Sequence, residues 1–473
     1  MKLSDSRLFR AQAYLDGAWA DADSKATFDV FNPATGAKLG AVPKMGRAET
    51  KRAIAAAARV MPEWAKRTAK ERANVLRKWF NLILENKDDL AQLMTAEQGK
   101  PLAESLNEVV YGASFIEWFA EEGKRIYGDT IPAHAADKRL LVLKQPIGVV
   151  AAITPWNFPN AMITRKCAPA LAAGCTVVIK PAEDTPYSAL ALAELADRAG
   201  FPKGAINVLT GVPEDIGAEM TSNPTVRKLS FTGSTEVGKL LMRQCADTVK
   251  KVSLELGGNA PFIVFDDADL DLAVTGAMAS KYRNTGQTCV CANRIMVQEK
   301  IHDEFVSRLA QAVSGMKVGD GLKGETQQGP LINQDAIDKV KRLVADAKKK
   351  GARVVIGGHK HELGGTFYEP TILTGVTSAM DIFSQEIFGP VAAIYTFKTE
   401  DEAIRMANDT PYGLAGYFYS RDLNRMWRVA EGLEYGLIGI NDGVIANDAA
   451  PFGGVKESGI GREGSKYGIE DFV

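Results

Sequence analysis

The spacing of hydrophobic residues changes along the chain. Over residues 49–124 apolar positions recur every three or four residues, as in Val75, Trp79 and Ile83, which predicts amphipathic helices. Beyond this region, short apolar or β-branched runs alternate with helical segments such as residues 188–199. The first runs are residues 149–154, 175–179, 206–209 and 228–232. This alternation predicts a mostly parallel sheet with helices on both faces.

A second series of the same kind begins after Gly257 and Gly258. Its runs are residues 262–265, 294–297, 353–356, 391–395 and 437–440. The fold class expected is therefore α/β, with two Rossmann-like open α/β units that meet near residue 257. Residues 138–144 have the pattern of a strand but do not fit the strand–helix alternation of either unit. They follow a predicted loop at residues 128–132. We expect this segment to be a protruding β arm that pairs with another subunit.

Composition excludes several classes of function. The 473 residues include 57 basic and 58 acidic side chains, a net charge of -1, which gives no electrostatic case for nucleic acid or an anionic membrane. The apolar stretches, such as residues 147–153, are too short to span a bilayer. Five cysteines and an N-terminus without an apolar run favour a reducing, cytoplasmic setting. The four histidines show no metal-binding spacing, so no metal is expected.

One short segment carries candidate nucleophiles, Gly286-Gln-Thr-Cys289-Val-Cys291. A thiolate attacks carbonyl carbon well, but the thiol needs partial exposure and help in losing its proton. Gly286 permits a tight turn before the cysteines. In an extended segment Cys289 and Cys291 would point to opposite faces, so only one would face a given pocket. From this motif alone, ordinary buried packing of both cysteines remains open.

Two segments are candidates for binding a nucleotide. Phe231-Thr-Gly-Ser-Thr-Glu-Val-Gly238 follows a predicted strand, where a glycine turn and a helix start bind phosphate. Gly233 to Lys239 has the spacing of a triphosphate-binding loop, but Leu240 replaces the hydroxyl residue that holds magnesium. A plain helix cap by Ser234 or Thr235 is the alternative.

The second segment is Lys180-Pro-Ala-Glu183, at the carboxyl end of another predicted strand. Glu183 could accept hydrogen bonds from ribose hydroxyls, and Lys180 could contact the ribose or a phosphate. The alternative is an acid at a helix start beside a solvated lysine.

Seven motifs in order resemble those of aldehyde dehydrogenases, from about Tyr14 to the C-terminus. They are Pro155-Trp-Asn-Phe-Pro159, Lys180-Pro-Ala-Glu183, Phe231-Thr-Gly-Ser-Thr235, Leu254-Glu-Leu-Gly-Gly258, Gly286-Gln-Thr-Cys289, Glu386-Ile-Phe-Gly-Pro390 and Pro451-Phe-Gly-Gly454. The loop around Cys289 and Cys291 and the tail at residues 461–469 most resemble the succinate-semialdehyde branch of this family.

The resemblance implies three catalytic roles. Cys289 would attack the aldehyde, and the Asn157 amide with the backbone amide of Cys289 would hold the resulting oxyanion. Glu255 would deprotonate the water that hydrolyses the thioester, which favours the free acid as product. Two other classes are disfavoured. Leu240 argues against a P-loop-type NTPase, and the joint presence of the three residues argues against a non-catalytic α/β protein.

The resemblance also implies a dinucleotide site. Its expected residues are Thr154, Pro155, Trp156, Lys180, Glu183, Gly211, Gly233, Ser234, Val237, Leu256, Glu386 and Phe388. Relatives that prefer NADP often carry a small residue at the position of Glu183. A carboxylate there would repel a 2′-phosphate, so NAD is the expected preferred cofactor. Lys180 could partly compensate, so NADP is expected to be tolerated.

The expected substrate is a small aldehyde carrying a carboxylate, namely succinate semialdehyde. In that branch two arginines and a serine hold the carboxylate, and the matching positions are Arg165, Arg283 and Ala446, with Phe452 beside them. Ala446 lacks the hydroxyl, so glutarate semialdehyde or another ω-oxo acid is the alternative. From sequence alone, Arg165 is somewhat better explained as part of a solvated helix face.

Three further expectations concern the domains, the assembly and the redox chemistry of the protein. Residues 1–127 and 146–257 would form the dinucleotide-binding domain, and residues 258–440 the catalytic domain. Residues 128–145 and 458–473 would form an oligomerisation arm of a homodimer or homotetramer. Cys291 is a redox candidate that could form a reversible disulfide with Cys289, although extended geometry opposes it and simple packing is equally well supported.

Overall fold

Helices occupy most of residues 47–122, as the hydrophobic spacing predicts. In the computed structural model, which describes residues 1–473, they are α1 (Arg47–Lys66), α2 (Ala69–Glu85), α3 (Lys87–Gln98) and α4 (Leu102–Glu122). Thr68 starts α2 with a capping box, because its side chain accepts from the Glu71 amide while Glu71 accepts from the Thr68 amide. Gly99 ends α3 in the left-handed region at φ 95°.

The first sheet has eight strands in the order β19-β11-β10-β7-β8-β9-β1-β2. Their bounds are β1 (Ala13–Leu15), β2 (Ala18–Ala20), β7 (Val149–Ile153), β8 (Thr176–Lys180), β9 (Ile206–Val208), β10 (Val226–Thr232), β11 (Lys251–Glu255) and β19 (Gly459–Ile460). The strands from β7 to β11 are parallel. The chain adds β8 and β9 on one side of β7 and then β10 and β11 on the other, so the strand order reverses between β7 and β10. Ligands bind beside the carboxyl ends of strands at such a switch point.

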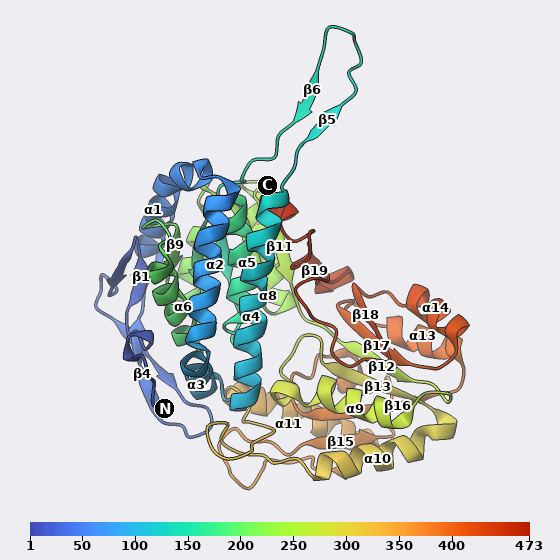
Figure 1. Ribbon diagram of the computed structural model, residues 1–473. Helices are drawn as coiled ribbons and strands as arrows, with labels where there is room; N and C mark the ends of the chain where they lie inside the picture. The colour runs from blue at the N-terminus through green and yellow to red at the C-terminus, as the bar shows by residue number, and fades with distance from the viewer.

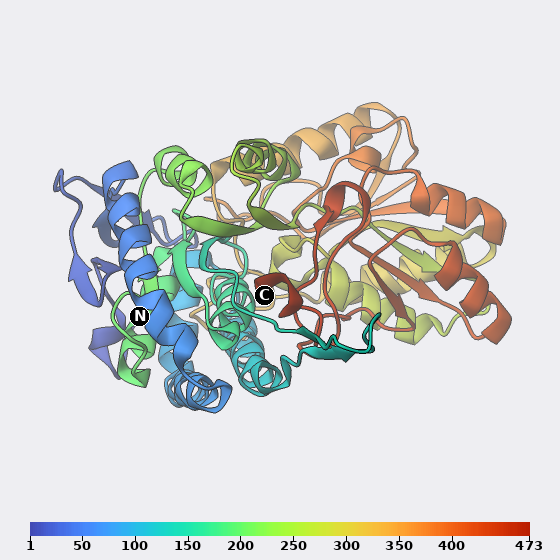
Figure 2. The same cartoon turned by 90° about the horizontal axis from the view of Figure 1, so that it is seen from above.

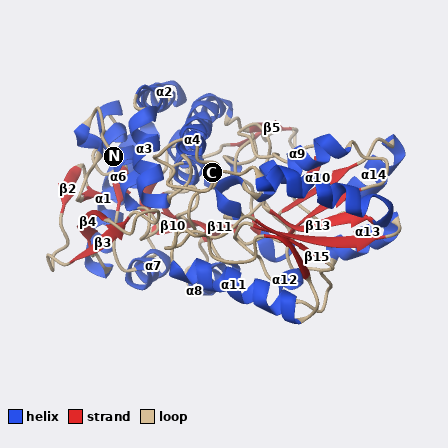
Figure 3. Cartoon of the chain, turned by 90° about the horizontal axis from the view of Figure 1, so that it is seen from below, coloured by secondary structure: helices blue, strands red, loops and turns tan.

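The second sheet has seven strands in the order β14-β15-β16-β13-β12-β17-β18, and only β14 runs antiparallel to its neighbour. The strands are β12 (Ala260–Val264), β13 (Ala292–Gln298), β14 (Arg353–Ile356), β15 (Thr371–Thr374), β16 (Val391–Phe397), β17 (Ala415–Tyr419) and β18 (Leu437–Ile440). The two sheets lie side by side, each with helices on its faces (Figures 2 and 3). The predicted pair of open α/β units is confirmed.

Ten helices alternate with these strands. They are α5 (Ala161–Ala173), α6 (Pro186–Ala199), α7 (Pro213–Ser222), α8 (Thr235–Ala246), α9 (Leu270–Lys281), α10 (His302–Ser314), α11 (Gln334–Lys349), α12 (Asp381–Ser384), α13 (Glu400–Asn408) and α14 (Leu423–Gly432). Every residue of α5 is buried, because α4 packs on its outer side. Arg165 and Lys166 of α5 are therefore carried into the protein interior.

Two hairpins stand apart from the sheets. One pairs β3 (Thr27–Phe31) with β4 (Lys38–Pro43), and the other pairs β5 (Asp129–Ile131) with β6 (Leu140–Val142). The second hairpin projects far from the rest of the chain, as expected for an arm (Figure 1). The expectation of a loop at residues 128–132 is wrong, because Thr130 pairs with Leu141.

The C-terminal segment returns to the first sheet. Strand β19 pairs with β11, and Phe472 belongs to the largest hydrophobic core together with Trp64, Trp79 and Phe119. The assignment of residues 458–473 to an oligomerisation arm stays a prediction, as does the division into domains. None of the helices has the length and apolar character needed to cross a membrane.

Candidate active site

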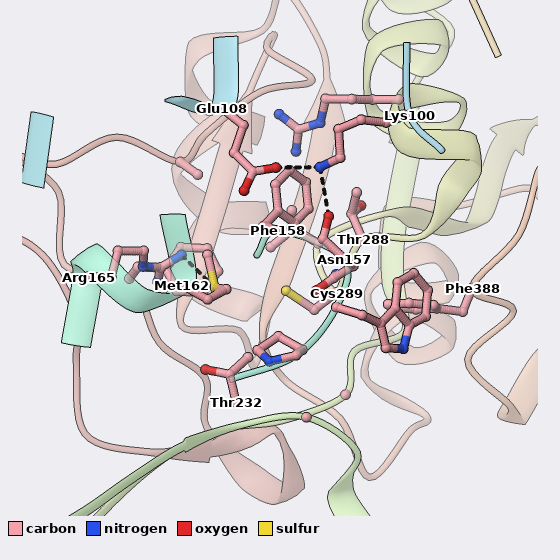
Figure 4. Close-up of a pocket in the computed structure, with 18 of the residues that line it drawn as sticks. Lys100, Glu108, Asn157, Phe158, Met162, Arg165, Thr232, Thr288, Cys289 and Phe388 are labelled. Carbon is pink, nitrogen blue, oxygen red and sulfur yellow. Dashed lines mark hydrogen bonds and ion pairs between the residues drawn. The ribbon is translucent and has the colours of Figure 1, made fainter. Parts of the chain in front are cut away.

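A cavity of about 630 Å³ lies where the carboxyl ends of β7 and β10 meet loops of the second unit. Its walls include Asn157, Gly233, Arg283 and Cys289, which come from distant parts of the sequence. The first unit supplies the loops after β7 and β10 and one face of α4. The second unit supplies the turn before β13 and the loop before β16. Figure 4 shows Asn157, Cys289 and Phe388, from three of these loops, around one space.

Cys289 lies on a turn in the cavity wall. The Cys291 amide donates to the Thr288 carbonyl at 3.1 Å, so the segment is a turn and the expectation of an extended strand is wrong. The thiols nevertheless separate, because Cys289 faces the cavity and Cys291 is buried with its Sγ 3.5 Å from the Lys281 carbonyl. Gly286 is required at φ 73°, since a side chain there would strike the Gly389 carbonyl.

Burial controls the acidity of the two expected reacting groups. It raises the pKa of the Cys289 thiol to about 12, and the nearby carboxylate of Glu386 acts in the same direction. Glu255, the last residue of β11, is also buried, and its Oε2 has no hydrogen-bond partner. Burial and then the Glu463 carboxylate raise the pKa of Glu255 well above its ordinary value. A carboxylate with a raised pKa is a stronger base, which suits proton transfer from a thiol or water.

Asn157 joins the first unit to the loop that carries Cys289. Its Nδ2 donates to the Gln287 carbonyl at 3.0 Å, which leaves the second N–H of the amide for another acceptor. Its main-chain carbonyl accepts from Lys100 Nζ at 2.7 Å and from Asn284 Nδ2 at 3.0 Å. The amide expected to hold an oxyanion is therefore fixed beside the nucleophile.

Both expected carboxylate-binding arginines line the same cavity, together with Ala446 and Phe452. The interpretation of Arg165 as a solvated helix residue is wrong, because its side chain is 3% exposed. Its guanidinium carbon lies 4.0 Å from the centre of the Phe452 ring. Arg283 is half-buried and lies 5.8 Å from the Phe158 ring, and its Nε has no hydrogen-bond partner.

Seven of the expected cofactor residues line this cavity. They are Pro155, Trp156, Gly233, Ser234, Leu256, Glu386 and Phe388. Trp156 and Phe388 meet edge to face with ring centres 5.5 Å apart. The helix cap by Ser234 is confirmed, because its side chain accepts from the Val237 amide at 3.3 Å. The carboxylate of Glu386 accepts from the Gly258 amide at 2.9 Å, and burial raises its pKa to about 7.

The remaining expected cofactor residues lie outside the cavity wall. They are Thr154, Lys180, Glu183, Gly211 and Val237. Lys180 is 4% exposed and forms an ion pair with Glu183, so the interpretation as a solvated lysine is wrong. Burial lowers the pKa of Lys180, and the Glu183 carboxylate opposes that effect.

The chain was compared with known proteins. Residues 19–473 match the model of the aldehyde dehydrogenase family. The chain belongs to this family. It is 64% identical to the glutarate-semialdehyde dehydrogenase of Pseudomonas aeruginosa and 65% identical to the NADP(+) succinate-semialdehyde dehydrogenase GabD of Escherichia coli, in each case over 100% of this chain and 98% of the relative. A crystal structure of succinate-semialdehyde dehydrogenase from Burkholderia pseudomallei, 62% identical, superposes with a TM-score of 0.99 over 100% of this chain and 98% of that one.

Aldehyde dehydrogenases use NAD or NADP, and the residues at the switch point suit such a cofactor. The start of α8, capped by Ser234, presents backbone amides beside the cavity, where a pyrophosphate binds well. Thr154 Oγ1 is buried without a hydrogen-bond partner at the end of β7. Glu386 places a carboxylate in the same cavity, and a carboxylate suits a ribose because it accepts hydrogen bonds from the hydroxyls. No group of three or more potential metal ligands lies together.

Sequence reasoning missed part of the wall of this aldehyde dehydrogenase cavity. Glu104, Glu108 and Tyr111 occupy one face of α4, and Lys100 precedes that helix. Glu104 and Glu108 lie four residues apart on α4, which also buries the apolar Val109 and Ile116, and this is a signal that could have been followed. Glu463 was also given no role, although its carboxylate lies 2.9 Å from Arg165.

Proposed function

We propose that this aldehyde dehydrogenase oxidises aldehydes that carry a distant carboxylate, with succinate semialdehyde as the main substrate. The observation that carries the proposal is the arrangement of Cys289, Arg165 and Arg283 around one cavity. A thiol at one place in the cavity and two guanidinium groups at others match an ω-oxo acid, which has an aldehyde at one end and a carboxylate at the other. The names of the relatives at 64% and 65% identity support the same class.

The first step is carbon–sulfur bond formation. Glu255 accepts the Cys289 proton, the sulfur adds to the aldehyde carbon, and the carbonyl oxygen takes the negative charge. The Asn157 side-chain amide and the Cys289 backbone amide donate to this oxyanion. The raised pKa of Glu255 supports its role as the proton acceptor, since the Cys289 thiol is also a weak acid and feels the Glu255 charge. Gly233, Ser234 and Glu386 would hold NAD, which would supply the hydride acceptor for this oxidation.

The second step is hydrolysis of the thioester on Cys289. Glu255 first releases the Cys289 proton to solvent and then removes a proton from water, the hydroxide adds to the acyl carbon, and the carbon–sulfur bond breaks. The acid leaves, and the Cys289 thiolate takes the proton back from Glu255, which restores both groups. The uncommitted Oε2 of Glu255 supports this role, because it has no hydrogen-bond partner within the protein.

Glutarate semialdehyde is the second candidate substrate. Ala446 stands in the cavity wall where a serine hydroxyl would otherwise add a hydrogen bond to the carboxylate. A methyl group there leaves space beside the arginines, which favours a chain one carbon longer. Relatives named for this activity, at 64% and 63% identity, support the alternative.

We propose NAD as the preferred cofactor, with NADP tolerated. Glu183 pairs with Lys180, the cation that would otherwise neutralise a 2′-phosphate, and the negative charge of Glu183 itself repels a 2′-phosphate.

We also propose a cytoplasmic homodimer or homotetramer joined through the β5–β6 hairpin. Exposed Ile131, Leu141 and Leu143 on that hairpin support an interface, and five free cysteines support a reducing compartment.

Steady-state assays test this function directly. The purified protein is given succinate semialdehyde, glutarate semialdehyde and butanal, each with NAD or NADP, and reduced nicotinamide is followed by absorbance. We expect the two ω-oxo acids to have far higher kcat/KM than butanal. Cys289→Ala serves as the inactive control. Equal kcat/KM for all three aldehydes would refute the substrate class, and a higher kcat/KM with NADP would refute the cofactor preference.

A further inference from the structure

A buried ion pair lies directly behind Asn157. Lys100, between α3 and α4, pairs with Glu108 of α4, and each side chain is only 1% exposed. Figure 4 shows Lys100 reaching both the Glu108 carboxylate and the main-chain carbonyl of Asn157. Neither charged residue belongs to the nucleophile, the base or the arginines described above.

This pair holds both ends of the segment that follows β7. Lys100 Nζ donates to the Asn157 carbonyl at 2.7 Å. Glu108 Oε1 accepts from the backbone amides of Asn160 at 2.9 Å and Ala161 at 3.2 Å, at the start of α5. The residues from 157 to 161 are therefore fixed from one side by a single bridged pair of charges.

A second side chain fixes the same carbonyl. Asn284 Nδ2 donates to the Asn157 carbonyl at 3.0 Å, and Gln98 Nε2 in turn donates to Asn284 Oδ1 at 3.0 Å. The Gln98 side chain also accepts from the Lys100 amide at 2.9 Å. Asn284 adopts φ 50°, a backbone conformation that residues other than glycine rarely maintain without such support.

The two donors restrain the Asn157 peptide, from which the side chain projects, and the bond from Asn157 Nδ2 to the Gln287 carbonyl restrains the side chain itself. A buried ion pair adds little to stability when compared with well-packed apolar residues, so stability alone does not explain its presence here. We propose that Lys100 and Glu108 are positioning residues that hold the Asn157 amide in the orientation needed to bind the oxyanion. This inference rests on the proposed role of Asn157.

Rapid-mixing kinetics with saturating NAD test the inference. Lys100→Met keeps the bulk of the side chain but removes the donor to Asn157. We expect it to slow the first turnover about 10- to 100-fold, as misplacement of a catalytic group by about 1 Å does. The loss should be equal for succinate semialdehyde and butanal, with KM little changed. Lys100→Arg should restore part of the rate, because it can pair with Glu108.

The chain offers a matched control for Glu108→Gln. Glu97 is also a buried carboxylate that accepts from two amides at a helix start, those of Tyr187 and Ser188, both at 2.8 Å. It does not line the cavity. We expect Glu97→Gln to change thermal stability without slowing the first turnover, whereas Glu108→Gln slows it. Equal slowing by both variants would show a general effect of buried charge and overturn the inference.

A double-mutant cycle separates action through Asn157 from direct action on the substrate. In the Asn157→Ala background, Lys100→Met should cause no further loss of rate. If the rate losses of the two single variants multiply in the double variant, Lys100 acts independently of Asn157 and the inference is overturned. A loss confined to KM for succinate semialdehyde would also overturn it and would assign Lys100 to the substrate carboxylate. If Lys100→Met does not fold, Asn284→Ala removes the second donor and takes its place in the cycle. A normal rate in Asn157→Ala alone would instead refute the proposed oxyanion role.

Discussion

Arg165 Nη2 lies 2.9 Å from Glu463 Oε2 in the interior of the protein. The same carboxylate accepts from Lys166, so one acid is shared between two neighbouring cations of α5. Arg165 therefore reaches the cavity with part of its charge already balanced. Arg283 forms no direct ion pair, although its charge acts on the buried Glu104 carboxyl, and this separates two arginines that sequence motifs treat as equivalent.

Arg283 should therefore dominate recognition of the substrate carboxylate. We expect Arg283→Leu to raise KM for succinate semialdehyde about 10- to 100-fold, the value of roughly 1.5 to 3 kcal/mol of charged hydrogen bonding. KM for butanal should change little, and Arg165→Leu should have the smaller effect on succinate semialdehyde. Steady-state kinetics of both variants with both aldehydes check this. Equal effects on the charged and uncharged aldehydes would refute the carboxylate site.

Glu463 should set the pH at which the base becomes active. Burial is the main reason for the raised pKa of Glu255, and the negative charge of Glu463 raises it further. Glu463→Gln removes that charge and leaves Arg165 and Lys166 unbalanced, and both changes lower the Glu255 pKa. Because a base acts when deprotonated, the acidic limb of kcat/KM against pH should move to lower pH. An unmoved limb, with activity otherwise retained, would show that Glu255 is not the titrating group.

The pairing of Glu183 with Lys180 predicts a way to change cofactor preference. Glu183→Ser removes a repelling charge and frees Lys180 for a 2′-phosphate. We expect kcat/KM for NADP to rise about ten-fold or more, the effect of roughly 1.4 kcal/mol, while kcat/KM for NAD falls. Glu183→Gln, which keeps the size but not the charge, should give an intermediate result. No gain with NADP in either variant would contradict this electrostatic account.

The turn that carries the two cysteines bears on the redox hypothesis. Cys291 is buried against the Lys281 carbonyl while Cys289 faces the cavity, so a disulfide between them requires the turn to open. We therefore expect Cys291→Ala to lose activity in peroxide at the rate of the parent, with the same recovery in dithiothreitol. Recovery in the parent but not in the variant would instead support a reversible disulfide.

Hydrophobic spacing predicted most of the fold because outer helices such as α2 have one buried face and most of the parallel strands are buried throughout. The helices between residues 47 and 122 and strands such as β8 follow the expected patterns. Strand β11 was missed, since its sequence begins with Lys251, ends with Glu255 and includes Ser253. Those polar residues are accommodated by partners brought from elsewhere, for example Asp471 for Ser253. Spacing along the chain cannot reveal such contacts.

The candidate site was predicted unevenly for the same reason. Cys289, Glu255 and Asn157 lie in short motifs that a family resemblance makes visible. Their surroundings depend on contacts between distant segments, such as Lys100 with Asn157. The solvated environment favoured for Arg165 was wrong, and so was the solvated alternative for Lys180. A charged side chain is normally exposed, but each of these is accompanied by an acid, and hydrophobic spacing along the chain does not reveal such a pair.

The return of the C-terminal segment to the first sheet has a consequence for biosynthesis. The ribosome completes β11 and Glu255 long before it adds β19, Glu463 and Phe472. Until then the nascent sheet has an open edge beside Glu255, and Arg165 and Lys166 lack their shared carboxylate. N-terminal regions generally fold first during synthesis, but here the earliest sheet is finished by residues that follow the whole second sheet. The enzyme is therefore expected to gain activity only after β19, Glu463 and Phe472 have been added.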